Sequence, residues 1–409
     1  MISRMKKHLS FLIKPASSDC NLFCDYCFYR KTAEDYPETS VHRITEDTIR
    51  TLVRKAQTPE RASVSYIWQG GEPMLMGLDF YRMVLEIQEE HRHPDQQVTN
   101  TIQTNAVSVN DEWARFFNAN NFLVGVSLDG PQHLYDIHRF TRGKNSVFHR
   151  VVSACDTLNK HRVEYNILAV VNNDTVQYPD TIYRYFRDKH FNYLQFIDCM
   201  EVVDDDIAPF SVTPKAFGDF LCRLFDLWLD DGYPNVSIRL FDNYLQYRVG
   251  RIPECCMYKD ECGQYFVLEH NGDIFPCDFF VTREWKLGNI NVDEIDFLIE
   301  STLRQDFAGK RSIPCVDCET CRWLGFCQRG CIKFRYQPTF NYSARNHMCE
   351  GYKQFFEYVD DAYNFLVWDI MRRQRGEPAA EAGRNEPCVC GSGKKFKKCC
   401  SRYSYLMNK

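Results

Sequence analysis

The sequence has no long hydrophobic run and no excess of basic residues. Its 409 residues carry a formal net charge of −5, with 50 Lys and Arg against 55 Asp and Glu. Proteins that bind nucleic acid mainly through phosphates need a basic surface, so this balance argues against nucleic acid as a partner. The apolar run from Leu9 to Ile13 is too short for a secretion signal or a membrane span. We therefore expect a cytoplasmic protein that does not use a membrane.

Disulfides are also expected to be absent, although the chain contains 20 cysteines. The cytosol keeps thiols reduced, so these cysteines must be ligands, nucleophiles or core residues. Cys155, Cys199 and Cys222 lie in apolar surroundings, where a free cysteine is most simply a small core residue. Hydrophobic residues make up 44% of the chain and charged residues 26%, which is typical of a globular protein with a sizeable core.

Short β-rich runs alternate with helical patterns through the first 250 residues. The expected strands are 9–14, 64–68, 101–103, 123–128, 165–171 and 193–197, and the expected helices are 45–56, 79–90, 111–118, 146–159 and 178–187. Repeated βα units predict an α/β fold with a parallel sheet or partial barrel, here a (β/α)6 unit. Such folds place their chemistry on the loops that follow the strands.

The composition changes after about residue 250, where cysteines become frequent. Residues 264–269 followed by Asn271-Gly272-Asp273 predict a hairpin, and residues 351–375 predict a helix. A polar stretch at 376–383 then precedes a basic tail. We expect a barrel domain at 1–250, a cysteine-rich domain at 251–375, a linker at 376–383 and a separate tail at 384–409.

Three cysteines follow the first expected strand with the spacing Cys20-x3-Cys24-x2-Cys27. A four-iron cluster that only passes electrons takes four thiolates, so three leave one iron open. An open position is where a substrate or cofactor binds. The alternative is a zinc site whose fourth ligand comes from elsewhere.

This loop, with Tyr26 before its third cysteine, resembles the signature loop of the radical S-adenosylmethionine superfamily. After the second strand, Gln69 and Gly70-Gly71-Glu72-Pro73 resemble that superfamily's glycine-rich motif for the amino group of the cofactor. Glycines allow close backbone approach, and a carboxylate suits an ammonium. Without the cysteine loop, this motif would be an ordinary turn. The resemblance implies S-adenosylmethionine as cofactor, bound by Gly70, Gly71, Glu72 and Pro73.

A second pair of cofactor contacts is expected after the fourth strand. The sequence reads Ser127-Leu128-Asp129-Gly130 there, followed by His138-Arg139. In related enzymes a serine and an arginine at this place contact the ribose and carboxylate of the cofactor. Arg139 suits a carboxylate because its guanidinium donates two parallel hydrogen bonds, although a solvated arginine is the alternative.

Eight more cysteines lie between residues 256 and 349, and they suit two fully ligated four-iron clusters. The alternative is two structural zinc sites, which use the same ligands. The arrangement resembles the SPASM auxiliary-cluster domain, and residues 15–363 together resemble the anaerobic sulfatase-maturating enzymes. That resemblance implies one cluster on Cys256, Cys262, Cys277 and Cys331 and another on Cys318, Cys321, Cys327 and Cys349. Ala106 departs from the family pattern, and Cys255 and Cys315 are extra thiols, of which Cys255 competes with Cys256 as ligand.

The tail resembles the SEC-C zinc motif. Its four cysteines are those expected to close a tetrahedral zinc site, which holds a segment that has no core of its own: Cys388, Cys390, Cys399 and Cys400. In that family the motif often docks on a partner protein, and the lysines here favour an acidic one. The alternative is a solvated basic tail that binds an ion but no partner.

The resemblance implies an enzyme that oxidises a Cys or Ser of a sulfatase to formylglycine, within a motif of the type Cys-x-Pro-x-Arg or Ser-x-Ala-x-Arg. It implies three four-iron clusters and an electron donor such as flavodoxin or ferredoxin. Asp278 adjoins the ligand Cys277, and the resemblance makes it the expected general base, with a solvated carboxylate as the alternative. The resemblance also implies that Tyr29 and Gln69 orient the target side chain.

Two other functions remain open. One is another SPASM peptide maturase that forms a thioether or crosslink, but the short segment before Cys20 leaves no room for a leader-binding domain. The other is a non-catalytic iron-sulfur adaptor, which has no use for the cofactor motif at 69–73.

Overall fold

The computed structural model describes the chain except residues 1, 205, 336–339, 379–381 and 409. The described chain forms two compact units, and each contains several segments. The first unit comprises Met1–Val170, Glu201–Val203 and Asp260–Ile313, and the second comprises Val171–Met200, Asp204–Lys259 and Pro314–Lys409. The predicted boundary at residue 250 stays a prediction. Within the described residues, no helix combines the length and apolar character that crossing a membrane requires.

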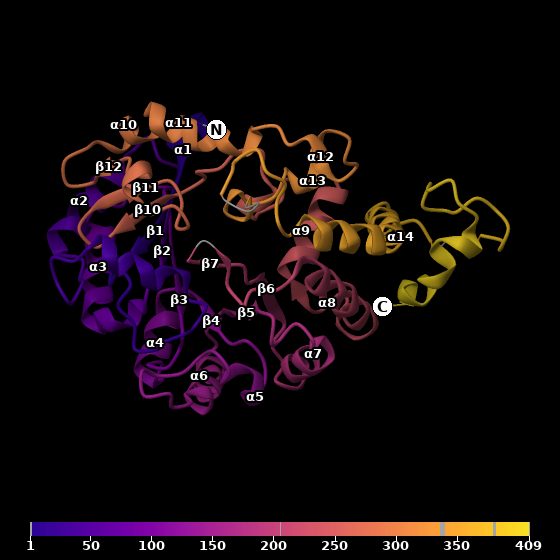
Figure 1. Cartoon of the computed structure of the whole chain (residues 1–409), viewed down its shortest axis with the longest axis horizontal. Coiled ribbons are helices and arrows are strands. Elements are labelled where there is room, and N and C mark those ends of the chain that lie inside the picture. The colour runs from indigo at the N-terminus through magenta and orange to yellow at the C-terminus, as the bar shows by residue number, and fades with distance from the viewer. Residues whose placement is uncertain (1, 205, 336–339, 379–381, 409) are drawn as a thin grey trace. The chain divides into compact units, whose positions relative to one another are not determined.

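The first unit is built on parallel strands, as predicted. In spatial order these are β1 (His8–Lys14), β2 (Ser63–Trp68), β3 (Gln97–Thr104), β4 (Leu123–Ser127) and β5 (Tyr165–Val171). The helices of the connections are α2 (Glu46–Ala56), α3 (Leu78–Glu90), α4 (Asp111–Ala119), α5 (Gln132–Tyr135) and α6 (Phe148–Lys160), labelled in Figure 1. The expected strands and helices in this part of the chain are confirmed, with ends that differ by a few residues.

Helix α2 shows why these elements form where they do. The Thr45 hydroxyl accepts a hydrogen bond from the Thr48 backbone N–H at 3.2 Å, which caps the first turn. Glu46 and Asp47 follow, where negative charge suits the helix dipole. The apolar residues then recur at helical spacing and are buried: Ile49, Leu52, Val53 and Ala56.

The predicted hairpin is present, and it extends the same sheet. It consists of β10 (Phe266–Glu269) and β11 (Asp273–Phe275), which are antiparallel, and β12 (Gly288–Asn289) follows beside β11. Strand β10 pairs in parallel with β1 on the side opposite β2, with Lys14 aligned with Glu269. The sequence does not predict this pairing. It brings a segment of the cysteine-rich region onto the first strand.

Smaller elements complete the first unit. They are α1 (Ile2–Lys7), the short strand β7 (Val202–Val203), the 3-10 turns η1 (Phe28–Asp35), η2 (Pro73–Met76), η5 (Arg283–Trp285) and η6 (Lys310–Ser312), and the helices α10 (Ile295–Glu300) and α11 (Thr302–Gly309). The turn η1 carries Phe28, whose ring centroid lies 4.8 Å from that of Phe279 beyond the hairpin. The segment after the three cysteines therefore packs against the segment after Cys277.

The second unit contains the predicted strand β6 (Tyr193–Asp198) and the predicted helix α7 (Pro179–Asp188). The short strand β9 (Ser237–Ile238) runs parallel to β6. The predicted C-terminal helix is α14 (Cys349–Gln374), and it packs on α8 (Pro214–Leu227). Helices α8 and α9 (Arg239–Arg248) are not among those that the sequence predicts. The remaining described elements of this unit are η3 (Trp228–Gly232), η4 (Cys256–Tyr258), β8 (Asp206–Ile207), α12 (Val316–Glu319), α13 (Leu324–Cys327), η7 (Ile332–Phe334), η8 (Phe396–Lys398), η9 (Cys400–Arg402) and η10 (Ser404–Asn408).

Helices α8 and α14 meet closely because glycines lie at their crossing. A Cβ on Gly351 would be 2.0 Å from the backbone oxygen of Pro214. Aromatic rings fill the adjoining core, where the centroids of Phe241 and Phe355 lie 5.4 Å apart and those of Tyr244 and Tyr363 lie 4.6 Å apart. Of the three predicted core cysteines, Cys155 and Cys199 are buried, whereas Cys222 on α8 is only partly buried.

Candidate functional site

The three-cysteine loop follows β1 and is held by the glycine motif that follows β2. The Gly71 N–H donates to the Ser17 carbonyl at 2.6 Å, and the Glu72 N–H donates to the Asp19 carbonyl at 2.7 Å. A Cβ on Gly71 would lie 1.9 Å from the Asp19 oxygen, so only glycine allows this approach. The two predicted motifs are therefore one structure, in which the glycines carry the backbone that leads into Cys20.

The thiols of this loop are partly buried near one another. Burial raises the pKa of Cys20 to about 12, and Glu72 and the other two thiols of the loop add to the shift. Burial likewise raises the pKa of Cys24 to about 11, with Arg139 acting in the opposite direction. The charge of Cys27 adds to the shifts of both Cys20 and Cys24. Thiols placed this close together form a donor set suited to a metal cluster, because a cation offsets their charges.

Glu72 is almost fully buried, and its carboxylate is hydrogen-bonded within the protein. Oε1 accepts from the Met74 N–H at 2.9 Å and from the Thr104 hydroxyl at 2.8 Å, and Oε2 accepts from the Asn105 N–H at 2.9 Å. Burial nevertheless raises the pKa of Glu72 to about 7. Oε2 accepts this one bond, so it has room for a second donor such as an ammonium.

Arg139 is buried and pairs with Asp129. Its Nε donates to Asp129 Oδ2 at 2.8 Å and its Nη2 donates to Oδ1 at 3.2 Å. Asp129 also accepts from the Tyr26 hydroxyl and from the Val170 N–H. The guanidinium thus has a fixed orientation beside Cys24, with its Nη1 directed to neither oxygen of Asp129. Ser127 is buried at the end of β4.

Tyr29 lies on η1 with its ring in an apolar cluster. The cluster consists of Leu12, Tyr29, Val267, Phe275 and Val281, with Cys27, Phe28, Ile67 and Tyr265 packed against it. The Tyr29 hydroxyl donates to Glu269 Oε1, and burial raises the pKa of this phenol well above its usual value. Pairing of β1 with β10 therefore brings Tyr29 and Cys27 beside the hairpin that leads to Cys277.

Asp278 follows Cys277 and is buried. Its Oδ1 accepts a hydrogen bond from the Tyr265 hydroxyl at 2.9 Å and lies 3.8 Å from Cys277 Sγ. This carboxylate is thus held next to the thiol of a predicted cluster ligand. Gln69, the third residue predicted to be catalytic, comes directly after β2, where its backbone N–H donates to the Ile13 carbonyl at 2.9 Å.

The predicted auxiliary-cluster ligands divide between the two units. Cys262 and Cys277 belong to the first unit, and Cys256 and Cys331 belong to the second, so their assignment to one cluster stays a prediction. The other predicted set lies within the second unit, where Cys318, Cys327 and Cys349 line one enclosed pocket. Among the charges that raise the pKa of Cys349 is that of the fourth cysteine of this set, Cys321.

Cys315, an extra thiol in the sequence, is buried next to the second set. Burial raises the pKa of Cys318 to about 12, and a hydrogen bond with Cys315 adds to the shift. The Cys318 N–H donates to the Cys315 carbonyl and the Cys321 N–H donates to the Cys318 carbonyl, so two successive turns place these cysteines together.

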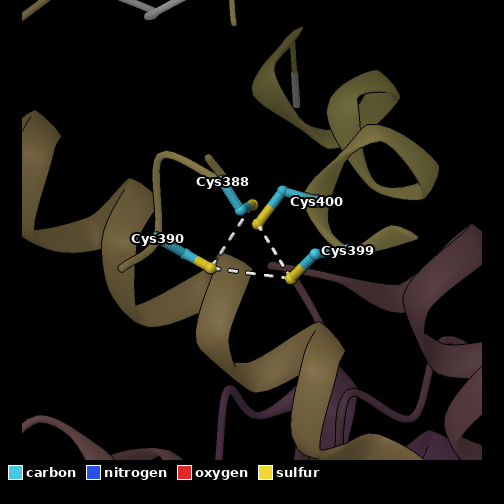
Figure 2. Close-up of side chains that lie close together, drawn as sticks. All are labelled: Cys388, Cys390, Cys399 and Cys400. Atoms are coloured by element: carbon cyan, nitrogen blue, oxygen red, sulfur yellow. Dashed lines mark hydrogen bonds between the residues drawn. The ribbon is translucent and has the colours of Figure 1, made fainter. Parts of the chain in front are cut away.

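The four tail cysteines surround a common point, as Figure 2 shows. The Sγ atom of Cys390 lies 3.5 Å from that of Cys388 and 3.6 Å from that of Cys399, and the Cys399 and Cys400 sulfurs are 3.9 Å apart. Tetrahedral zinc with Zn–S bonds of about 2.3 Å requires sulfur–sulfur distances of about 3.8 Å. The geometry of this group therefore suits zinc. In the part of the chain that the structure describes, it is the one group of possible ligands that converges within 4.8 Å.

Several residues of this site are absent from the sequence-based prediction. Glu269 holds Tyr29 from 240 residues away, whereas Tyr265 holds Asp278 across 13 residues and Asp129 holds Arg139 across 10. Lys14 is a further residue of the site that the prediction lacks. The sequence did mark it, because it is a charged residue at the end of an apolar strand. The structure buries it completely.

Comparison with known proteins agrees with the arrangement of these motifs. Residues 15–186 match the model of the radical SAM superfamily, residues 255–322 match an iron-sulfur cluster-binding domain called SPASM, and residues 384–402 match the SEC-C motif. These matches contain the three-cysteine loop, the hairpin with Cys277, and the tail cysteines. The first two support binding of S-adenosylmethionine and iron-sulfur clusters.

Similar proteins cover nearly the whole chain. A cysteine-type anaerobic sulfatase-maturating enzyme of Clostridium novyi is 38% identical over 373 residues, which span 90% of this chain and 100% of the relative. A serine-type anaerobic sulfatase-maturating enzyme of Bacteroides thetaiotaomicron is 32% identical, with 90% of this chain and 93% of the relative covered. A solved structure of native anSMEcpe with bound AdoMet and a peptide has a TM-score of 0.82 at 33% identity, and covers 89% of this chain and 99% of that one. The chain therefore belongs to the anaerobic sulfatase-maturating enzymes of the radical SAM superfamily, which are oxidoreductases.

Proposed function

We propose that this enzyme oxidises a Cys or Ser side chain of a sulfatase to formylglycine under anaerobic conditions. The observation that carries the proposal is the buried carboxylate of Asp278. It adjoins a predicted cluster ligand and lies in the same compact unit as the three-cysteine loop. Once a hydrogen atom has left the β-carbon, the target must still lose a proton from its hydroxyl or thiol and an electron. A base and an electron acceptor are therefore needed close together, and Asp278 beside a cluster on Cys277 is suited to both tasks.

Residues around the loop would hold the cofactors. Cys20, Cys24 and Cys27 would ligate the cluster with an open iron, and residues 70–73, Ser127 and Arg139 would bind S-adenosylmethionine. When bound, this pair supplies the radical that abstracts a hydrogen atom from the β-carbon of the target residue. The Gly71 backbone supports the loop, and Glu72 Oε2, which accepts a bond from the Asn105 N–H, would accept a second from the ammonium of the cofactor.

Asp278 would take the proton from the hydroxyl or thiol of the target, while the electron passes to the acceptor. A Ser target would then be the aldehyde, and a Cys target would be a thioaldehyde that water hydrolyses to the aldehyde with release of hydrogen sulfide. The Tyr265 hydroxyl orients the carboxylate through Oδ1, which leaves Oδ2 for the substrate. Tyr29 is fixed by Glu269 and by its apolar cluster, so it provides a rigid wall against which the target side chain rests. Gln69 would contact the target from the end of β2.

The remaining cysteines complete the proposal. Two auxiliary four-iron clusters would occupy the sets led by Cys256 and Cys318, which brings the total to three, and zinc would occupy the tail.

The substrate motif is of the type Cys-x-Pro-x-Arg or Ser-x-Ala-x-Arg, and flavodoxin or ferredoxin supplies electrons. An acidic partner docks on the basic tail. Residues 1–250, 251–375 and 384–409 would serve as the barrel, auxiliary-cluster and zinc domains, and the enzyme acts in the cytoplasm.

The test uses anaerobically reconstituted enzyme, S-adenosylmethionine, a reductant and peptides of both motif types. We expect aldehyde on the peptide by mass spectrometry, and we expect Asp278→Asn to cleave the cofactor but to lower the aldehyde yield at least about 100-fold, as loss of a general base does. The matched control is Asp306→Asn, which changes a mostly exposed carboxylate of the same unit that pairs with Lys310. Near wild-type aldehyde from Asp278→Asn would dismiss that residue as the base. If the wild type cleaves the cofactor but oxidises neither peptide, another peptide-maturing reaction is favoured.

A further inference from the structure

Lys14 is a lysine with no solvent exposure in the middle of the candidate site. It ends β1, and its Nζ has no hydrogen-bond partner within the described part of the chain. The ammonium lies 4.0 Å from the centre of the Tyr29 ring, a cation–π contact. Burying a charged group without a hydrogen-bond partner is costly, and a cation–π contact offsets only part of that cost. The position is costly for folding, which points to a functional reason for the lysine.

The surroundings of Lys14 are anionic. Burial lowers the pKa of this lysine, and four groups oppose that shift: Asp278, Glu269, Cys27 and Cys277. These groups belong to three segments of the chain: Cys27 precedes η1, Glu269 ends β10, and Cys277 and Asp278 follow β11. Two of these groups are thiols that are expected to ligate different clusters. The geometry agrees: the Tyr29 ring beside Lys14 Nζ belongs to the apolar cluster against which Cys27 and Tyr265 pack, and the Tyr265 hydroxyl lies 4.0 Å from Cys277 Sγ. The charge of Lys14 therefore acts on both cluster positions within the first unit.

Neighbouring cations do not duplicate this charge. Arg139 is buried as well, but its guanidinium makes two hydrogen bonds to Asp129. Lys286, from the end of the same hairpin region, pairs with Asp273 at 2.7 Å and is 43% exposed, so solvent screens it. Lys14 differs from both because its charge is neither paired by a hydrogen-bonded carboxylate nor screened by water.

We propose that Lys14 is a positioning residue that holds the Tyr29 ring and raises the reduction potentials of the clusters on Cys27 and Cys277. Reduction adds an electron to a cluster, and a nearby positive charge in a medium of low polarity stabilises the added negative charge. On the Cys277 side, a higher potential makes the cluster a better acceptor for the electron that leaves the substrate. The role of the Cys277 cluster as electron acceptor rests on the proposed function. The effect of Lys14 on the two reduction potentials does not depend on which substrate the enzyme oxidises.

The test is a redox titration of the anaerobically reconstituted full chain, followed by electron paramagnetic resonance. Lys14→Met and Lys14→Gln remove the charge while they keep most of the side-chain volume, and Lys14→Arg keeps the charge. We expect both neutral variants to shift the two potentials to more negative values, with Lys14→Arg close to wild type. Lys286→Met is the matched control, since it removes an exposed lysine from the same unit, and its potentials should equal those of the wild type.

Three outcomes would overturn the proposal. The first is an unchanged pair of potentials in a neutral variant that retains its iron. The second is an equal shift in Lys286→Met. The third is loss of iron from both neutral variants, which would give Lys14 a role in folding alone. Failure of the proposed function looks different, because the wild type would then form no aldehyde while the potentials still depended on Lys14.

Discussion

At the scale of single residues, Glu72 makes the stability of the protein depend on pH. Its pKa rises from an ordinary value of 4.5 to about 7 on folding, because burial disfavours the carboxylate. The folded protein therefore binds this proton more tightly, so the contribution of Glu72 to stability is greatest below pH 4.5 and is lost as the pH rises to 7. At about 1.4 kcal/mol per unit, Glu72 accounts for a loss of about 3 kcal/mol. We expect Glu72→Gln to reduce the fall in unfolding midpoint between pH 5 and pH 8, measured by thermal denaturation without cofactor. An unchanged profile would contradict this assignment.

Gly71 tests the contact between the glycine motif and the cysteine loop. A methyl group at this position would overlap the Asp19 carbonyl, so Gly71→Ala must displace the backbone that leads into Cys20. We expect the variant to lose about a third of its iron, the content of one of three clusters, and to bind S-adenosylmethionine at least about tenfold more weakly. Iron analysis and equilibrium titration measure both effects. Gly309→Ala is the control, because a Cβ there has nothing within 4 Å; a similar loss in that variant would refute the argument.

At the scale of elements, the tail docks on the helices of its own unit. Lys394 pairs with Asp361 of α14 at 2.6 Å, Tyr405 donates to Asp230 at 3.1 Å, and the Tyr403 ring contacts the buried Phe365. Removing the chain after Arg375 should release the zinc and leave iron content and cofactor cleavage unchanged. It should also lower the unfolding midpoint by several degrees, because Phe365 becomes exposed.

The control for that truncation is a Cys399→Ser, Cys400→Ser double variant, which removes zinc ligands from the full-length chain. It should lose the metal as well, and its midpoint should lie between those of the wild type and the truncation if part of the tail stays docked. Loss of iron from either protein would show that the zinc domain is not separate from the clusters.

At the scale of the whole molecule, the proposal predicts the number of clusters. Three four-iron clusters contain about twelve irons, and replacing Cys20, Cys24 and Cys27 by Ala should leave about eight. The two auxiliary sets should persist because none of their predicted ligands belongs to that loop. Iron and sulfide analysis of both proteins after anaerobic reconstitution decides the count. Zinc in place of iron among the eight central cysteines would contradict it.

Local patterns account for much of the fold and of the donor set. The period of apolar residues predicted the six strands and five helices of the βα region, and cysteine spacing predicted which thiols are ligand candidates. Helix α8 was missed although it buries Phe217, Phe220, Leu221, Leu224 and Phe225 at helical spacing, so the sequence did carry a usable period there. Helix α9 has a weaker pattern, with Phe241, Asn243 and Tyr244 as its buried residues. The Cys222 side chain was expected in the core, but α8 leaves it partly exposed.

The amino-acid sequence alone was sufficient for the family, the cofactor motifs and the four cysteines of the tail. Those features are formed by residues that lie close together in the sequence, so their spacing can be recognised without the structure. Only the tertiary structure decided that β10 pairs with β1, because a parallel pairing between residues 14 and 269 depends on the packing of everything between them. That pairing brings Glu269 to Tyr29 and the charge of Lys14 to Cys27 and Cys277. Buried charges act through space and not along the chain, so no spacing rule could have placed Lys14 at the centre of the site.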